Sequence, residues 1–209
     1  MDIFILERTV PPDDEVVTLE ELRVHIGEFA NVTEKNTKMT ALIKMAREWA
    51  EQYTGRALLT QTWRLTIGDQ AAQFANVDSD TVQGYYRGPY YARSDGGILL
   101  RRAPVASITS IASVNGSGVE TAIASANYEL READSKWPRV VPIVGSLTGN
   151  LRITYVAGWT DTEDVPERFR QAILIYAEAM YDRDPKEMPA LISAAEHLLD
   201  PESSNLQLA

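Results

Sequence analysis

The chain has 209 residues, of which 44% are hydrophobic and 24% charged, a composition typical of a soluble globular protein. It carries a net charge of −10 and no cysteine. Disulfides, thiolate metal sites and cysteine nucleophiles are therefore excluded, and the acidic balance argues against a protein that grips DNA through clustered lysines and arginines. The longest apolar stretch, residues 172–177, is far shorter than the roughly 20 residues of a membrane-spanning helix, so no membrane contact is predicted.

The N-terminal third of the chain predicts two helices. Thr18 and Glu21 form a capping-box pattern, in which each side chain bonds the backbone N–H of the other residue, so a short helix should follow and end near Gly27. A second helix is predicted over residues 37–53, because apolar residues recur there three and four positions apart. Gly55 is placed to end it in the left-handed conformation. The apolar face of the second helix consists of Met39, Leu42, Ile43, Ala46, Trp49, Ala50 and Tyr53.

The middle of the chain changes to the alternating pattern of β-strands. In residues 59–67 the apolar side chains fall mainly on every second position, as in a strand with one buried face. The Asn-Gly-Ser-Gly sequence at 115–118 predicts a hairpin turn, since these residues tolerate positive φ. We therefore predict a small, mostly antiparallel β-rich insertion over residues 59–156. Its strands are expected at 59–67, 98–100, 108–114, 119–123, 128–130 and 151–156.

The C-terminal part returns to helical periodicity. Pro166 suits the first turn of a helix, because no N–H is needed there, and a shorter helix is predicted over residues 189–199. Residues 200–209 lack a core-forming pattern and are expected to form a flexible tail. The predicted fold class is thus α+β, with N- and C-terminal helices packed as a helical core and the β insertion inside a single domain, residues 1–209. The core-packing anchors are predicted to be Trp49, Tyr53, Phe169 and Tyr176.

Candidates for catalysis or cofactor binding are few. His25 and His197 lie on predicted helices, outside any nucleophile motif. The glycine-containing segment 145–150 lacks the lysine that a phosphate-binding loop requires. We therefore predict that the chain is not an enzyme, and we assign no catalytic residue, no cofactor site and no metal site.

One group of carboxylates suggests a different possibility. Glu129, Glu132 and Asp134 cluster in the sequence, and enzymes that cut cell-wall glycan use two carboxylates that face each other across a cleft. Arg131 and Lys136 lie among them, however, and this mixture of charges favours a solvated turn.

A long connection between predicted strands, residues 69–97, contains tyrosine pairs that alternate with arginines. Loops of this length are usually functional or disordered. Tyrosine and arginine are enriched at protein interfaces, but they also stack on bases and pair with phosphates, and a plain surface loop remains a third possibility. In an acidic chain the protein contact is favoured over the nucleic acid. The residues predicted to make that contact are Tyr85, Tyr86, Arg87, Tyr90, Tyr91 and Arg93.

Several separated pieces of the sequence, in their shared order, resemble the phage head–tail connector (adaptor) proteins. The most specific is EQYTGRALLTQTW at residues 51–63, which is similar to the family pattern E-x-Y-T-G-R-A-L-I-x-Q-T-W. The resemblance spans residues 17–182. It departs from the pattern at Arg101, where the family has proline, and in the long segment 69–97. The other matching pieces lie at residues 17–26, 100–105, 137–138, 155–159 and 165–173.

The resemblance implies a structural ring protein of the virion, made in the cytoplasm of a bacterial host and placed on the portal at the head–tail interface. Such a ring, of about twelve copies to match the portal, extends the DNA channel, lets genomic DNA pass without sequence-specific binding, and docks a tail-side stopper or tail protein. The Tyr/Arg segment would then contact a neighbouring subunit or the tail side. The C-terminal segment would dock on the portal and become ordered there, with a frayed terminus as the alternative. Its apolar residues are Leu198, Leu199, Leu206 and Leu208.

A second hypothesis is a DNA-binding accessory factor of genome packaging. Arg87, Arg93, Arg101 and Arg102 would form its basic surface. A packaging factor should bind DNA at low salt with a steep salt dependence, whereas a connector should hardly bind DNA at all.

Overall fold

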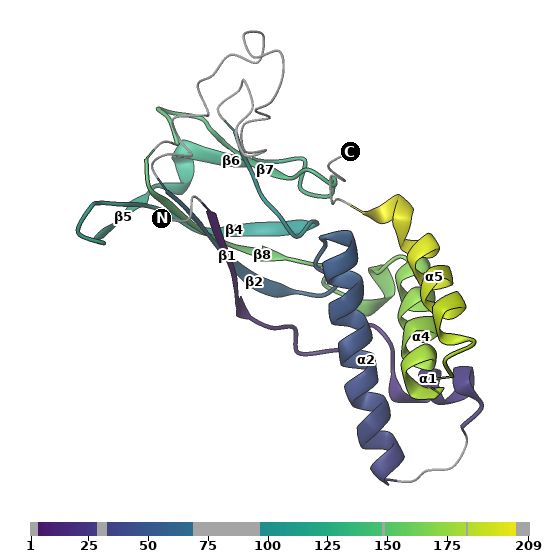
Figure 1. Ribbon diagram of the computed structural model, residues 1–209. Coiled ribbons are helices and arrows are strands. Elements are labelled where there is room, and N and C mark those ends of the chain that lie inside the picture. Colours follow the sequence, from purple (N-terminus) through teal and green to yellow (C-terminus); the bar gives the residue numbers. More distant parts are fainter. Residues whose placement is uncertain (1–3, 29–32, 69–96, 148, 183, 204–209) are drawn as a thin grey trace. The chain divides into compact units, whose positions relative to one another are not determined.

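The computed structural model describes residues 4–28, 33–68, 97–147, 149–182 and 184–203. Along the sequence, α1 and α2 precede a run of antiparallel strands and α4 and α5 follow it, and this mixture of helices and strands confirms the predicted α+β class (Figure 1). Within the described ranges, no helix is both long and apolar enough to cross a membrane. The helices are α1 (Leu19–Ile26), α2 (Thr33–Thr54), α4 (Glu167–Asp182) and α5 (Met188–Leu199), with short 3-10 helices η2 (Ser125–Asn127), η3 (Thr162–Asp164) and η4 (Asp200–Glu202). The strands are β1 (Phe4–Val10), β2 (Gln61–Ile67), β3 (Ile98–Leu99), β4 (Val105–Val114), β5 (Glu120–Ile123), β6 (Tyr128–Arg131), β7 (Arg139–Pro142) and β8 (Leu151–Ala157).

The chain folds into two compact units. One unit, here called the helical unit, consists of Pro12–Leu59 and Trp159–Ala209. The other, the sheet unit, consists of Met1–Pro11 and Thr60–Gly158. Each unit is therefore assembled from two separate segments of sequence. The second segment of the sheet unit, Thr60–Gly158, holds the described strands β2 to β8, in the region where the β-rich insertion at residues 59–156 is expected.

The ends of the N-terminal helices follow from local chemistry. The Thr18 hydroxyl accepts a hydrogen bond from the Glu21 backbone N–H at 3.2 Å, and the Glu21 carboxylate accepts one from the Thr18 N–H at 2.6 Å. The predicted capping box is thus confirmed. Gly27 ends α1 with φ of 70° and Gly55 follows α2 with φ of 71°, a left-handed conformation that glycine adopts at least cost.

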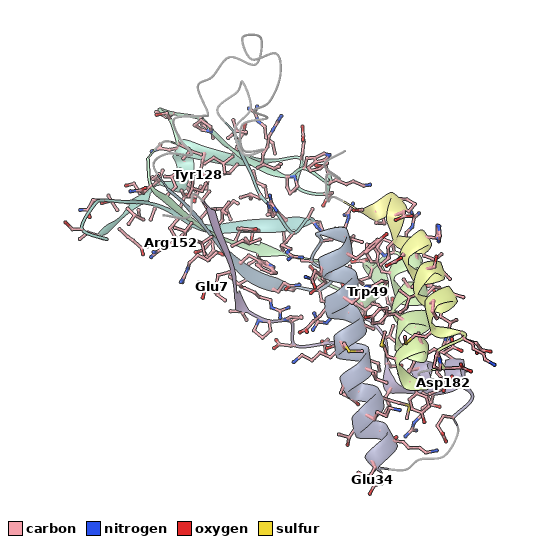
Figure 2. All side chains as sticks on the ribbon, viewed as in Figure 1. Glu7, Glu34, Trp49, Tyr128, Arg152 and Asp182 are labelled. Atoms are coloured by element: carbon pink, nitrogen blue, oxygen red, sulfur yellow. The ribbon has the colours of Figure 1, made fainter. Side chains whose placement is uncertain are left out.

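One apolar core joins α1, α2, α4 and α5 within the helical unit. Trp49 lies on the side of α2 that faces α4 and stacks on Tyr176, with ring centroids 4.1 Å apart and ring planes at 13° (Figure 2). Tyr53 lies 5.7 Å from Trp49, and Phe169 is completely buried. The four aromatic residues expected to anchor the core therefore lie in it or pack against it. Its buried members include Leu22, Met39, Leu42, Ile43, Ala46, Ala50, Phe169, Ala172, Ile173, Ala177, Ala195 and Leu199.

The larger sheet of the sheet unit has five antiparallel strands in the order β1-β2-β8-β4-β5. Strands β2 and β8 alternate between buried and half-buried residues, the pattern of a sheet with one covered face. Leu65 pairs with Leu6 on one side and Ile153 on the other, and Ile153 pairs in turn with Ile111. The covered face is therefore continuous across the strands.

The predicted Asn-Gly hairpin connects β4 to β5. Asn115 Oδ1 accepts hydrogen bonds from the N–H groups of Ser117 at 3.0 Å and Val119 at 2.9 Å. Gly118 has φ of 80° and donates its N–H to the Asn115 carbonyl at 2.9 Å. A second, three-stranded sheet has the order β3-β7-β6 and is also antiparallel.

Two strands were missing from the sequence prediction. Residues 4–10 form β1, although the run Phe-Ile-Leu shows no clear alternation and invited no strand assignment. Residues 139–142 form β7, whose four residues are too few for a periodic pattern. Strand β1 is specified by pairing with β2, more than fifty residues away, and β7 by pairing with β6 on one side and β3 on the other, rather than by their own sequence.

Candidate assembly surfaces

The C-terminal end of α2 lies in the sequence piece, residues 51–63, that most closely resembles the connector family. Side chains and backbone groups at this helix end hydrogen-bond one another within the helical unit. The buried Glu51 carboxylate accepts the Leu58 backbone N–H at 3.0 Å. The Thr54 hydroxyl donates to the Ala50 carbonyl at 2.7 Å and accepts the Arg56 N–H at 3.4 Å. These bonds satisfy polar groups at the helix end, where intrahelical partners run out. Glu51, Thr54 and Arg56 of the Glu-x-x-Thr-Gly-Arg pattern therefore take part in the hydrogen bonding of the helix end itself.

Arg47 connects the end of α2 to the segment that precedes α1. Its guanidinium is only 2% exposed and bonds Glu15 through Nε at 2.7 Å and Glu51 through Nη1 at 3.0 Å. Burial alone would lower the pKa of Arg47, but the hydrogen bond to Glu15 and the charges of both carboxylates outweigh it and raise the pKa. The network fixes the Glu15 segment and the Leu58 segment on the same helix.

A second ion-pair cluster holds the start of the C-terminal tail on the helical unit. Glu202 pairs with Arg56 at 3.1 Å and with Arg168 at 3.0 Å, and its carbonyl accepts Arg56 Nε at 3.0 Å. Tyr53 donates its hydroxyl to Asp200 at 2.5 Å, and this bond, together with burial, raises the pKa of Tyr53 to about 12. Residues 200–203 are thus tied down by side chains of α2, α4 and the loop after α2, directly before residues 204–209.

The leucines predicted to contact the portal fall into two groups. Leu199 is completely buried in the helical core, and Leu198 is partly buried against it. Leu199 therefore has no side-chain surface to offer a partner in this conformation. Leu206 and Leu208 lie outside the described residues.

Of the residues predicted to contact a subunit, the tail or DNA, some are described by the structure and others are not. The whole Tyr/Arg segment lies outside the described residues, which includes Tyr85, Tyr86, Arg87, Tyr90, Tyr91 and Arg93. Of the proposed basic surface, Arg101 is exposed and Arg102 lies with its guanidinium 4.9 Å from the ring centre of Trp63. The Arg8 guanidinium lies 6.0 Å from the centre of the same ring, so two arginines are within reach of a cation–π interaction with Trp63.

Four of the titratable residues considered for catalysis, namely His25, His197, Glu129 and Glu132, have partners of their own. His25 Nε2 lies 2.9 Å from Glu178, and His197 Nδ1 lies 2.7 Å from the Ser193 carbonyl on the preceding turn. Among the acidic trio, Glu129 pairs with Arg131 and Glu132 with Arg139. Within the described part of the chain, no group of three or more histidine and acidic side chains is placed to hold a metal ion.

The five-stranded sheet ends in two unlike edges. At one end, among the residues that the structure describes, β1 pairs only with β2, and it exposes Ile5 by 52% and Val10 by 50%. At the other end β5 pairs with β4 only over Ile111–Val114, so residues 106–110 of β4 have no partner strand on that side among the described residues. Edge strands present unpaired N–H and C=O groups, and natural proteins usually protect them. Within the five-stranded sheet, these two edges are the places where a further strand could pair.

The two units also differ in charge. Of the 30 acidic residues, 20 lie in the helical unit, and of the 20 basic residues, 10. The helical unit thus carries the whole net charge of −10, and the sheet unit is neutral. The acidic character inferred from the whole sequence is a property of the helical unit alone.

The fold recurs in solved structures of gene transfer agent (GTA) particles. A chain in the virion of the native GTA particle matches with a TM-score of 0.65 at 21% identity, over 91% of this chain and 94% of that chain. Chains in the neck of the empty particle, computed with C6 symmetry, and of the native particle, computed with C12 symmetry, match with TM-scores of 0.63 and 0.59 at 20% and 21% identity, with the same coverage. The chain has the fold of these neck and virion components. No protein-family model and no curated protein matches the sequence.

The structural likeness covers both units, because it extends over nine-tenths of the chain. It therefore includes the β-rich part as well as the helices. The resemblance to phage connector proteins stated from the sequence is confirmed at the level of the fold.

Proposed function

We propose that this protein is a structural subunit of the neck of a tailed phage or phage-like particle, where it forms a ring on the portal. The ring extends the DNA channel and provides the docking surface for the next tail-side protein. The observation that carries the proposal is the full-length likeness to chains in GTA necks computed with C6 and C12 symmetry. The ordered resemblance of six sequence pieces to connector proteins supports it independently.

The charge distribution is compatible with a channel protein. A ring of about twelve copies would carry a strongly negative charge, all of it contributed by the helical units. Negative surface repels the DNA backbone, so DNA would slide past it without being held. Such a role is structural rather than catalytic.

Portal attachment is assigned to the C-terminal residues that follow the Glu202 cluster. Arg56 and Arg168 hold the chain at Glu202, so residues 204–209 start from a fixed point on the helical unit. Leu206 and Leu208 remain the proposed portal contacts, whereas Leu199 is occupied in the core. The Tyr85–Arg93 segment remains the proposed contact to a neighbouring subunit or the tail side.

The proposal is tested by removing the gene from the particle-producing host. A neck subunit predicts DNA-filled heads and separate tails that fail to join, with complete particles restored by the gene supplied in trans. A packaging factor predicts heads without DNA instead. Normal numbers of complete particles in the deletion strain would contradict both functions.

DNA binding by the purified protein separates the same two hypotheses in solution. A neck subunit should show no measurable binding to duplex DNA between about 50 and 200 mM salt, because its net charge is −10. Strong binding at the low end that falls steeply across this range would favour the packaging factor.

A further inference from the structure

The first half of β4 is an open strand edge. One side of β4 pairs with β8 along its length, whereas β5 covers the other side only from Ile111 to Val114. On that side the Val105 N–H bonds the Ala133 carbonyl at 3.0 Å. Between these two points, residues 106–110 make no hydrogen bond across the edge to any described residue. Four of these residues are small and exposed, and strand side chains project from the faces of the sheet, so the backbone edge itself stays accessible; they are Ala106, Ser107, Thr109 and Ser110.

The opposite edge of the same sheet is β1, seven residues long. Its exposed Ile5 and Val10 are two of the few large apolar side chains that the described part of the molecule leaves in solvent. Glu7 and Arg8 are the charged residues between them, and Glu7 lies 3.9 Å from Arg64 of the same sheet. An edge with two exposed β-branched residues favours pairing with another strand.

The two edges match in direction and length. Every neighbouring pair in the sheet is antiparallel, so β1, β8 and β5 run one way while β2 and β4 run the other. A β1 strand from a second copy, placed in the same orientation, would therefore meet β4 as an antiparallel partner, in line with β5. Its seven residues suffice to cover the five open residues of β4.

We propose that β1 of one copy pairs with the open β4 edge of the next copy, so that the ring closes through a continuous sheet. This inference rests on the proposed ring function. The contact joins two different edges of one sheet, which is the heterologous type of contact that closed rings require. Register shifts of β4 against β8 at Val105/Ser107 and Ile108/Ser110 bend the strand, so we expect a short ladder centred on Ser107 to Thr109.

Paired lysine substitutions test the β1 edge. Ile5→Lys places a charge on the proposed contact, as natural edge strands do to prevent pairing. Val144→Lys is the matched control, because Val144 is 65% exposed in the same unit but lies outside both edges. Both variants should melt at the wild-type temperature, since neither side chain is buried. Only Ile5→Lys should lose the ring, measured by native mass spectrometry of the full-length protein with the portal of the same particle.

Cysteine cross-linking tests the partner edge, and the cysteine-free chain gives it a clean background. Glu7→Cys combined with Ser107→Cys, or with Thr109→Cys to allow for register, should form a ladder of covalent oligomers on mild oxidation of the assembled ring. Val144→Cys combined with Ser107→Cys should not. Disulfides need Cα atoms within about 7 Å, so a ladder reports direct strand contact.

The outcomes separate this inference from the proposed function. A wild-type ring that Ile5→Lys leaves intact, or that neither cysteine pair cross-links, would overturn the strand pairing and leave the neck function standing. A wild-type protein that forms no ring alone or on the portal would overturn both.

Discussion

The helical unit and the sheet unit differ in how their polar groups are paired. In the helical unit, Arg47 and Glu51 are buried together, and Arg56 and Glu202 close the C-terminal end. In the five-stranded sheet, β1 and the first half of β4 are open edges among the described residues, and a cross-strand ion pair between Arg64 and Glu7 lies near the surface. The first arrangement stabilises the unit internally, and in the proposed strand pairing the second would complete its hydrogen bonding with a neighbouring copy. The labelled side chains Glu7 and Arg152 lie on the sheet, and Trp49 and Asp182 on the helices (Figure 2).

The buried ion pairs give the largest expected effect and the sharpest contrast between the units. Arg47→Ala would leave Glu51 buried without its cation, and it should lower the free energy of unfolding by about 3–5 kcal/mol, measured by urea denaturation. Arg64→Ala in the sheet unit should cost about 1 kcal/mol or less, because its side chain is 41% exposed and Glu7 is 3.9 Å away. Equal losses in the two variants would remove the distinction between the units.

The aromatic stack on α2 and α4 comes next. Trp49→Ala removes a partly buried ring that stacks on Tyr176, and we expect a loss of about 3 kcal/mol of unfolding free energy, seen as a lower Tm. Trp49→Phe should recover most of that loss, since it keeps an aromatic ring at the site. An unchanged Tm in Trp49→Ala would show that the helical core is packed differently.

The C-terminal cluster should contribute less to stability but more to attachment. Glu202→Ala removes the partner of Arg56 and Arg168 and should cost about 1–2 kcal/mol, measured by thermal denaturation. It should also weaken binding to the portal, because the tail loses its fixed starting point. Glu163→Ala, an exposed carboxylate on η3, serves as the control and should change neither quantity. If Glu202→Ala binds the portal with wild-type affinity, the ion-pair cluster at Glu202 has no role in portal attachment.

The smallest effect is a pH dependence at the same cluster. The hydrogen bond to Asp200 and burial raise the pKa of Tyr53 to about 12, above its ordinary value near 10. A raised pKa means that the folded state favours the protonated hydroxyl, so this stabilisation is complete below pH 10 and is lost as the pH rises towards 12. The Tm of wild type should therefore fall more than that of Tyr53→Phe across this interval. Parallel curves for the two proteins would contradict the assignment.

The sequence predicts a structural feature when neighbouring residues determine it, and fails when distant segments do. The capping box of Thr18 and Glu21, the helix end at Gly55 and the turn at Asn115 are each set by neighbouring residues, and all three were predicted. Strand β1 was not, because it is defined by pairing with β2 more than fifty residues away. The bond between Arg47 and Glu15 and the open edge of β4 likewise depend on distant segments. No pattern in a short stretch of sequence predicts these features.

The candidate contacts show the same division. Composition identified the Tyr/Arg segment and the terminal leucines as unusual, but burial of Leu199 follows only from the packing of α5 against α4. The acidic net charge was visible at once, yet its confinement to the helical unit required knowing which segments fold together.

The central claim is that copies of this chain form a ring on a portal, and native mass spectrometry of the full-length protein tests it most directly. The protein is measured alone and then with the portal of the same particle. We predict either a free ring or a monomer that adds to the portal in a fixed multiple, with about twelve copies contributing roughly 280 kDa. A monomer that remains unchanged in the presence of the portal would contradict the claim.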